Sequence, residues 1–372
     1  MNVPLLDLKA QYREIRGDVL KAIETVCDEQ GFILGPRVAE LEQSLAKYIG
    51  TQHAIGVASG SDALLLSLMA MGVGHGDEVI TVPFTFFATA GAISRLGAKP
   101  VFVDIRPDTF NMDPSQIERK ITSRTKAIIP VHLFGQCADM EAIGEIAKRR
   151  ALHVIEDACQ AIGASRNGTR AGALGDTGCF SFFPSKNLGG FGDGGLITTN
   201  DARLSETLMM LRVHGSRVRY MHDLVGINSR LDSLQAAILQ VKLKHLDQWA
   251  EGRRRNAGRY EQLFRDAKLL DRVVLPKTDT GNHHVFNQFT IRAQRRDELR
   301  AYLKEKGIGT EIYYPVPMHL QACYRELGYQ KGDFPVSERA AQEVLSLPIY
   351  AELSSDQLAY VVEMIEEFYR RH

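Results

Sequence analysis

Short apolar runs alternate with longer amphipathic stretches between about residues 50 and 215. The short runs are rich in β-branched residues, as strands are, and the longer stretches repeat apolar residues with the period of a helix. The predicted strands are HAIGVAS, DEVITV, PVFVDI, KAIIPVHLFG and LHVIEDA, and the predicted helices are DALLLSLMAM, ATAGAISRL, MEAIGEIAKRR and DARLSETLMMLRVH. This alternation predicts an α/β fold with a mostly parallel central sheet covered by helices.

The pattern changes in the last third of the chain. A long segment with helical periodicity begins at RLDSLQAAILQV and forms a bridge to a second region of α+β type. That region has an alternating strand in VFNQFTIRA, a helix in DELRAYLKEKG that ends at glycine, and a capping box from Ser354 to Gln357. Because 372 residues exceed the usual size of one core, we expect a large domain over residues 1–250 and a smaller one over residues 251–372.

Composition narrows the classes of partner. The chain has 45 basic and 45 acidic side chains, so no net field favours nucleic acid or an anionic membrane. Its five cysteines are odd in number and lack CxxC spacing, which argues against a disulfide framework and a metal site. The N-terminus lacks an apolar signal segment, and the apolar runs are too short to span a bilayer. We therefore expect a cytoplasmic protein.

The first candidate for chemistry is a lysine in the run FSFFPSKNLGGFGDGG. Lys186 follows an apolar strand-like segment and precedes five glycines. The match Gly190-x-Gly192-x-x-Gly195 is not a dinucleotide fingerprint, because a strand pattern follows it where a helix is required. Glycines without side chains would let a flat group approach Lys186 closely. The alternatives are a turn cluster and a solvated surface lysine.

The second candidate is a tight strand-to-helix turn, Ser59-Gly60-Ser61-Asp62, between AIGVA and ALLLSLMAM. The free N–H groups and the positive dipole end of a helix that begins here would suit a phosphate. The alternative is that Ser61 is an ordinary N-cap.

The third candidate is HVIEDACQAIGA, in which a buried strand ends at Glu156 and Asp157 and is followed by Gln160. Carboxylates at the carboxyl ends of strands face the usual ligand crevice of an open α/β sheet. The alternatives are a helix cap for Asp157 and a surface amide for Gln160. Together, a lysine, a phosphate cradle and a strand-end carboxylate meet the needs of pyridoxal 5'-phosphate.

With these three stretches, the sequence resembles the sugar aminotransferases of the DegT/DnrJ/EryC1/StrS family, which have fold type I of the pyridoxal-phosphate enzymes. The resemblance covers essentially the whole chain through FILGPRVAELE, SGSDAL, PFTFFATA, IEDACQAIGA, SFFPSKNLGGFGDGG, VGINSRLDSLQAAIL and YYPVPMHLQ. It implies a homodimer with active sites at the subunit interface.

The resemblance also implies roles for single residues. Lys186 would bind the cofactor covalently and move protons, and Asp157 would keep the pyridine nitrogen protonated. Phe86 would stack on the ring; its alternative is a core phenylalanine at a strand-to-helix junction. Gln160 would lie beside the phenolic oxygen of the cofactor. The phosphate would be bound by Gly60, Ser61, Asp62 and Ser181 of the same subunit. Asn228 would reach the phosphate from the partner subunit.

The reaction that the resemblance implies moves the nitrogen of L-glutamate to a keto group of a nucleotide-linked sugar. The motif versions are most similar to members that aminate C3, either of a UDP-linked N-acetylglucosaminuronate or of a dTDP-linked 6-deoxyhexose, and a 4-keto sugar is a further alternative. We favour the uronate, on a route to a surface polysaccharide such as O-antigen, because the planar fork of Arg230 could bind its carboxylate; an ion pair with Asp232 is the alternative. Tyr313, Tyr314 and His319 would close over the sugar, although a histidine in such a place is often only packed.

Two alternative functions can be weighed against the same residues. Relatives that dehydrate sugars carry histidine in place of the lysine, so Lys186 disfavours a dehydratase. A regulatory protein that binds the cofactor without turnover is the alternative from another class, and turnover with glutamate would distinguish it.

Overall fold

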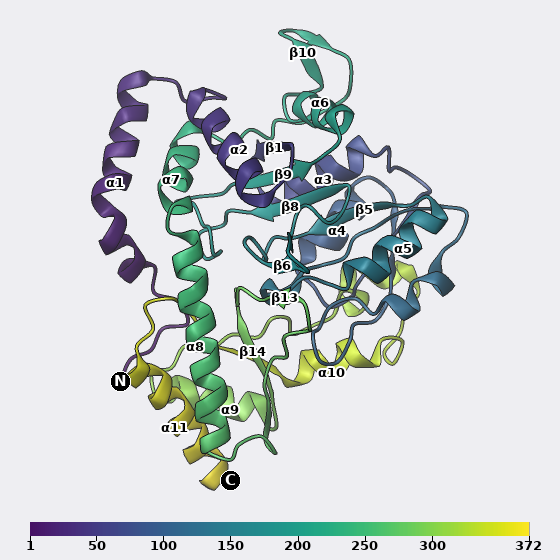
Figure 1. Cartoon of the computed structure of the whole chain (residues 1–372). Coiled ribbons are helices and arrows are strands. Elements are labelled where there is room, and N and C mark those ends of the chain that lie inside the picture. The colour runs from purple at the N-terminus through teal and green to yellow at the C-terminus, as the bar shows by residue number, and fades with distance from the viewer. Residues whose placement is uncertain (372) are drawn as a thin grey trace.

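The computed structural model describes residues 1–371, and its centre is a seven-stranded sheet (Figure 1). Strands β3, β2, β4, β5 and β8 run parallel to one another, and β9 runs antiparallel to both β1 and β8. This confirms the predicted mostly parallel sheet. The strand order is β1 (His53–Val57), β9 (Gly195–Thr199), β8 (Thr177–Ser181), β5 (His153–Asp157), β4 (Thr125–Ile128), β2 (Glu78–Thr81) and β3 (Lys99–Phe102).

Neighbouring residues of a strand point to opposite sides of the sheet. Both faces of this sheet are apolar, and helices cover both of them. In β8, Cys179 packs in one apolar cluster with helices α3 (Gly60–Ala70) and α6 (Ala202–Leu211). The next residue, Phe180, packs in another with helices α2 (Pro36–Ile49) and α7 (Ser233–Leu243). Helices α4 (Phe87–Arg95) and α5 (Met140–Arg150) complete the layers, and α1 (Leu8–Glu29) lies beside α7.

The long periodic segment forms two helices. Helix α7 ends at Leu243, and α8 (Leu246–Asp266) continues after the short break at Lys244 and His245. Helix α8 leads into the C-terminal region, as Figure 1 shows. The predicted division between residues 250 and 251 falls inside this helix and stays a prediction.

The C-terminal region is built on a small antiparallel sheet of β12 (Val273–Val274), β14 (Phe289–Ala293) and β15 (Val344–Leu347). Its helices are α9 (Arg296–Glu305), α10 (Pro335–Glu343) and α11 (Ser355–Arg371). The predicted capping box is confirmed: the Ser354 N–H donates to Gln357 Oε1 at 3.0 Å, and the Gln357 N–H donates to Ser354 Oγ at 3.2 Å. The region is α+β, as the pattern predicted.

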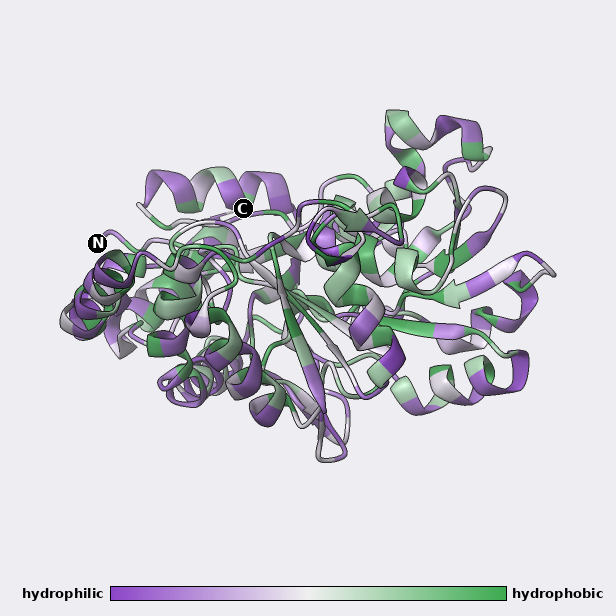
Figure 2. Cartoon of the chain, turned by 90° about the horizontal axis from the view of Figure 1, so that it is seen from above, coloured by the Kyte–Doolittle hydropathy of each residue, from purple (hydrophilic) through white to green (hydrophobic). Residues whose placement is uncertain are grey.

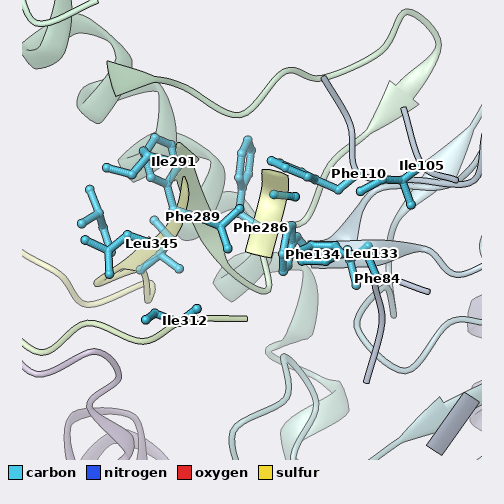
Figure 3. Packing of buried hydrophobic residues seen from close by; sticks show 14 of the residues in the cluster. Phe84, Ile105, Phe110, Leu133, Phe134, Phe286, Phe289, Ile291, Ile312 and Leu345 are labelled. Atoms are coloured by element: carbon cyan, nitrogen blue, oxygen red, sulfur yellow. The ribbon is translucent and has the colours of Figure 1, made fainter. Parts of the chain in front are cut away.

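One apolar cluster joins the two regions. Phe84, Phe110 and Phe134, from connecting segments beside the large sheet, pack together with Phe286 and Phe289 from the C-terminal region (Figure 3). Hydrophobic residues line the inner strands, and hydrophilic ones gather on the outer helices (Figure 2). Because the two regions share one close-packed core, their positions relative to each other are fixed.

Two short pairings lie at the edges of the molecule. Strands β10 (Ser216–Val218) and β11 (Met221–His222) form a hairpin that stands away from the body beyond α6 (Figure 1). Strands β13 (Asn282–His283), β6 (Ser165–Arg166) and β7 (Thr169–Arg170) form a three-stranded sheet. Over residues 1–371, every helix is too short or too polar to cross a bilayer.

Candidate active site

A cavity of about 410 Å³ lies where the parallel strands of the large sheet end. Strand β5 ends in its wall at Asp157, and β8 ends there at Ser181. The N-terminus of α3 and the loop that carries Lys186 form further walls. The carboxyl ends of parallel strands are the usual place for a ligand in an open α/β sheet. The three stretches singled out in the sequence therefore meet at one cavity.

Asp157 is held rigidly in the cavity wall, with 6% of its surface exposed. Its Oδ2 accepts a hydrogen bond of 2.7 Å from Thr89 Oγ1, and its Oδ1 accepts one of 3.2 Å from the Cys159 N–H. It is the last residue of β5 and is followed by a turn, so it does not cap a helix. A carboxylate fixed in this way offers a defined negative charge to a ligand.

Lys186 is half-buried and lines the same cavity. Burial lowers the pKa of its amine, although Cys159 and Asp157 act in the opposite direction. The turn after it is tight, because a Cβ atom at Gly189 would lie 2.3 Å from the carbonyl oxygen of Pro184. The glycines thus shape the loop around Lys186, and the lysine is not a solvated surface charge.

The N-terminus of α3 differs in one detail from the sequence prediction. Its N-cap is Ser59, whose Oγ accepts a hydrogen bond of 3.1 Å from the Asp62 N–H, so the N-cap alternative for Ser61 was wrong. The Asp62 N–H is engaged in this cap, and Asp62 does not line the cavity. Gly60 and Ser61 do line it. A Cβ atom at Gly60 would meet Ser181 Cβ at 2.7 Å, so this glycine lets the helix end approach β8.

Gln160 and Tyr314 form a pair in the cavity wall. Gln160 Oε1 accepts a hydrogen bond of 2.7 Å from the Phe134 N–H, and Gln160 Nε2 donates one of 3.0 Å to the Tyr314 hydroxyl. Gln160 is buried, so it is not a surface amide. Burial raises the pKa of Tyr314, which keeps its hydroxyl protonated.

Phe86 also lines the cavity and keeps 57% of its surface exposed. The core phenylalanine at this junction is instead Phe84, which is fully buried. The exposed Phe86 ring is a face that a flat ligand can cover.

Besides Asp62, three predicted site residues lie outside the cavity walls formed by residues 1–371. Asn228 pairs with Val213 in an isolated bridge. Arg230 is half-buried and forms no ion pair with Asp232, whose carboxylate caps α7. His319 is buried, and its Nε2 lies 3.0 Å from Glu338 Oε1. The structure of one chain therefore does not bring these three residues to the cavity.

Sequence reasoning missed other residues of the cavity and its support. Thr89, Cys159, Asp193 and Gln288 were not singled out, and they support or line the cavity. Gln288 carried a signal, because it is a polar residue inside the apolar run VFNQFTI. Thr89 carried none, since its contact with Asp157 joins residues 68 positions apart.

The walls fit pyridoxal phosphate. The N–H groups of Gly60 and Ser61 and the Ser181 hydroxyl suit its phosphate, the fixed Asp157 suits the ring nitrogen, and the open Phe86 face suits the ring. Within residues 1–371, no group of His, Cys, Asp and Glu could hold a metal ion. The fold and the cavity walls are those of an α/β protein that can bind an organic cofactor with a phosphate group.

Comparison with known proteins gives the family. The model of the DegT/DnrJ/EryC1/StrS aminotransferase family matches residues 13–366, and the chain belongs to this family. It is 47% identical over 363 residues to the UDP-N-acetyl-3-dehydro-α-D-glucosamine 3-aminotransferase of Acidithiobacillus ferrooxidans, covering 98% of this chain and 97% of that protein. It is also 56% identical over 370 residues to a protein of Geobacillus stearothermophilus called "Pleiotropic regulatory protein", covering 100% and 99%.

Among solved structures, DesV of S. venezuelae in complex with a ketimine intermediate superposes with a TM-score of 0.96. It is 45% identical and covers 100% of this chain and 99% of its own. The protein is therefore a pyridoxal-phosphate-dependent sugar aminotransferase with fold type I.

Proposed function

We propose that this aminotransferase moves the amino group of L-glutamate to the 3-keto group of a UDP-linked N-acetylhexosamine, with the uronate as the preferred sugar, to make an amino sugar for a surface polysaccharide. The observation that carries the proposal is the meeting of Lys186, Asp157 and the N-terminus of α3 in one cavity. The UDP-linked 3-keto sugar is the substrate named for the Acidithiobacillus relative. The preference for the uronate rests on Arg230, whose planar guanidinium can bind a carboxylate.

In this proposal, bound pyridoxal phosphate supplies a carbonyl carbon that accepts the amino group and a ring that takes up electrons. Gly60 and Ser61 bind the phosphate through their N–H groups, and Ser181 binds it through its hydroxyl. Asp157 holds a proton on the ring nitrogen, and Thr89 keeps the carboxylate in place by its hydrogen bond of 2.7 Å.

Lys186 then acts as the general acid and base. Burial lowers the pKa of its amine, so the neutral form is reached more easily near neutral pH. That neutral amine would accept the proton that leaves the substrate carbon and would hold it for return within the site. Phe86 would cover one face of the ring, and Gln160 would hold the ring hydroxyl.

Asn228 and Arg230 would act in the active site of a second copy of the chain. Both lie outside the cavity of their own chain, and the nearby β10–β11 hairpin exposes Val218, Tyr220 and Met221. Such apolar surface is typical of an interface. We infer a homodimer in which Asn228 reaches the partner's phosphate site and Arg230 binds the sugar carboxylate with its planar fork.

The first experiment is the visible spectrum of the holoenzyme before and after L-glutamate, beside Lys186→Ala. We expect a yellow band that bleaches with glutamate in the natural protein and no such change in the variant. A protein that binds the cofactor and reacts with no amino donor would instead have the regulatory role that the name of the Geobacillus relative suggests.

The second experiment compares keto-sugar acceptors with the aminated enzyme. We expect the UDP-linked 3-keto uronate to react faster than the neutral UDP-linked sugar, a dTDP-linked 3-keto-6-deoxyhexose or a 4-keto sugar. Arg230→Gln should remove the preference for the uronate, whereas Arg230→Lys should keep part of it. Equal rates for the uronate and the neutral sugar in the natural enzyme would contradict the role of Arg230.

A further inference from the structure

A small side chamber opens beside the main cavity. It has a volume of about 50 Å³ and shares Ser185, Gln288 and Tyr313 with the cavity that Lys186 lines. A cavity needs roughly 10–15 Å³ to hold one water molecule, so the chamber has room for a carboxylate but not for a sugar ring. Any substrate group that enters it must therefore be small.

The wall of the chamber carries a buried cation. Arg253 of α8 is 6% exposed and lines the chamber. Its hydrogen bonds to the carbonyl oxygens of Phe286, Asn287 and Ile349, at 2.9–3.3 Å, all start from Nη1. These bonds fix the guanidinium and leave Nε and Nη2 for another acceptor.

Arg253 lacks a carboxylate partner. Among residues 1–371, no acidic side chain forms an ion pair with it, and Glu352 acts on it only at longer range. Burial lowers the pKa of Arg253 to about 10, so it remains cationic at neutral pH. A buried cation without a paired anion is costly, and an anionic ligand would remove that cost.

Gln288 stands at the passage between the chamber and the main cavity. Its Oε1 is buried and has no hydrogen-bond partner within residues 1–371. Gln160, by contrast, uses both ends of its amide. A buried acceptor without a donor destabilises a protein, and a ligand that brings an N–H group would remove that cost.

We propose that the side chamber is the carboxylate subsite of the amino donor, in which Arg253 binds the carboxylate and Gln288 Oε1 accepts a hydrogen bond from the donor's ammonium group. An α-amino acid carries both groups on one carbon, and Gln288 lines both spaces. The subsite also separates the two substrates that must use Lys186 in turn, because the keto sugar is too large for the chamber. The inference rests on the proposed function in taking an amino acid as donor.

The test uses the holoenzyme with Gln288→Glu, which places a negative charge at the passage, and Gln342→Glu as a control on the exposed surface of α10. We expect Gln288→Glu to raise the L-glutamate concentration for half-maximal bleaching by about tenfold or more. The rate of the aminated enzyme with the keto sugar should fall by a clearly smaller factor, because the keto sugar does not enter the chamber. Gln342→Glu should change neither quantity.

A binding measurement without chemistry completes the test. Glutarate has the carboxylates of the donor but no amine, and calorimetry with the holoenzyme should show binding that Gln288→Glu and Arg253→Lys each weaken by about tenfold. Arg253→Lys retains a cation, and its melting temperature would reveal a failure to fold.

Unchanged binding of L-glutamate and glutarate in Gln288→Glu would overturn the subsite. An equal loss in the keto-sugar reaction would overturn it too, because Gln288 would then serve both substrates. If no amino donor bleaches the natural enzyme, the proposed function fails, whereas glutarate calorimetry still reports on the chamber.

Discussion

The side-chain nitrogen of Gln160 donates a hydrogen bond of 3.0 Å to the hydroxyl oxygen of Tyr314, although 154 positions separate the two residues. Gln160 follows the end of β5, and Tyr314 belongs to the C-terminal region. Because the other end of the amide accepts from the Phe134 N–H, Gln160 is fixed on both sides. This contact joins the two regions across the wall of the active-site cavity.

Replacing Tyr314 by phenylalanine tests that contact. The variant leaves the Gln160 N–H without its acceptor, so the free energy of unfolding should fall by about 0.5–1.5 kcal/mol and turnover should fall as Gln160 loses its orientation. Urea unfolding and the rate of glutamate bleaching measure the two effects. Tyr369→Phe is the matched control: its hydroxyl donates to the Gln294 carbonyl at 2.6 Å away from the cavity. A loss of turnover in both variants would refute a specific role for Tyr314.

Replacing Lys186 by methionine should separate activity from stability. We expect turnover to fall by roughly 10²–10⁴-fold or more, because the general acid and base is lost. The melting temperature of the cofactor-free protein should stay the same or rise, since burial disfavours the charged amine. Calorimetry of the cofactor-free proteins makes the comparison. A variant that melts much earlier would show that Lys186 has a structural role instead.

Gly60→Ala tests the close approach of α3 to β8. The added Cβ would lie 2.7 Å from Ser181 Cβ and 2.9 Å from Cys159 Sγ, so we expect a loss of about 1–3 kcal/mol in stability and weaker binding of pyridoxal phosphate. Gly144→Ala in α5 is the control, because nothing lies within 4 Å of its added Cβ. That control should be neutral or stabilising by up to about 1 kcal/mol. Equal behaviour of the two variants would contradict the packing argument.

Lys242 gives a prediction about pH. It is buried on α7, and its Nζ donates to the Gly189 carbonyl at 2.5 Å, in the loop that follows Lys186. Burial lowers the pKa of Lys242 to about 8, against the opposing effect of Glu352 and from an ordinary value of 10.5. Between these two values the unfolded chain binds more protons than the folded protein, so folding is favoured as pH rises.

The free energy of unfolding of the natural protein, relative to Lys242→Met, should therefore increase between pH 8 and 10.5. The increase has an upper limit on the order of 3 kcal/mol. Urea unfolding at several pH values measures it, with Lys244→Met on the exposed side of the same helix end as control. A difference that is flat or falls over this range would contradict the shifted pKa.

Much of the fold could be predicted from the sequence because its signals are local. The strand that ends at Asp157, the helix that starts at Gly60 and the capping box of Ser354 and Gln357 each depend on residues within a few positions. The rejected dinucleotide fingerprint shows the same, since Gly195 begins the strand β9 and not a helix. The N-cap was misplaced by two residues because Ser59 and Ser61 carry the same hydroxyl and only backbone geometry distinguishes them.

The sequence by itself determined the order of the elements and the kinds of side chain at the ends of the strands, because hydrophobic period and turn chemistry act over short distances. Only the tertiary structure decided which polar groups meet. Thr89 contacts Asp157, Gln160 contacts Tyr314, and Gln288 opens on the chamber of Arg253. The physical reason is that these contacts join distant segments, and the packing of the shared core sets their positions. No pattern along the chain records that packing.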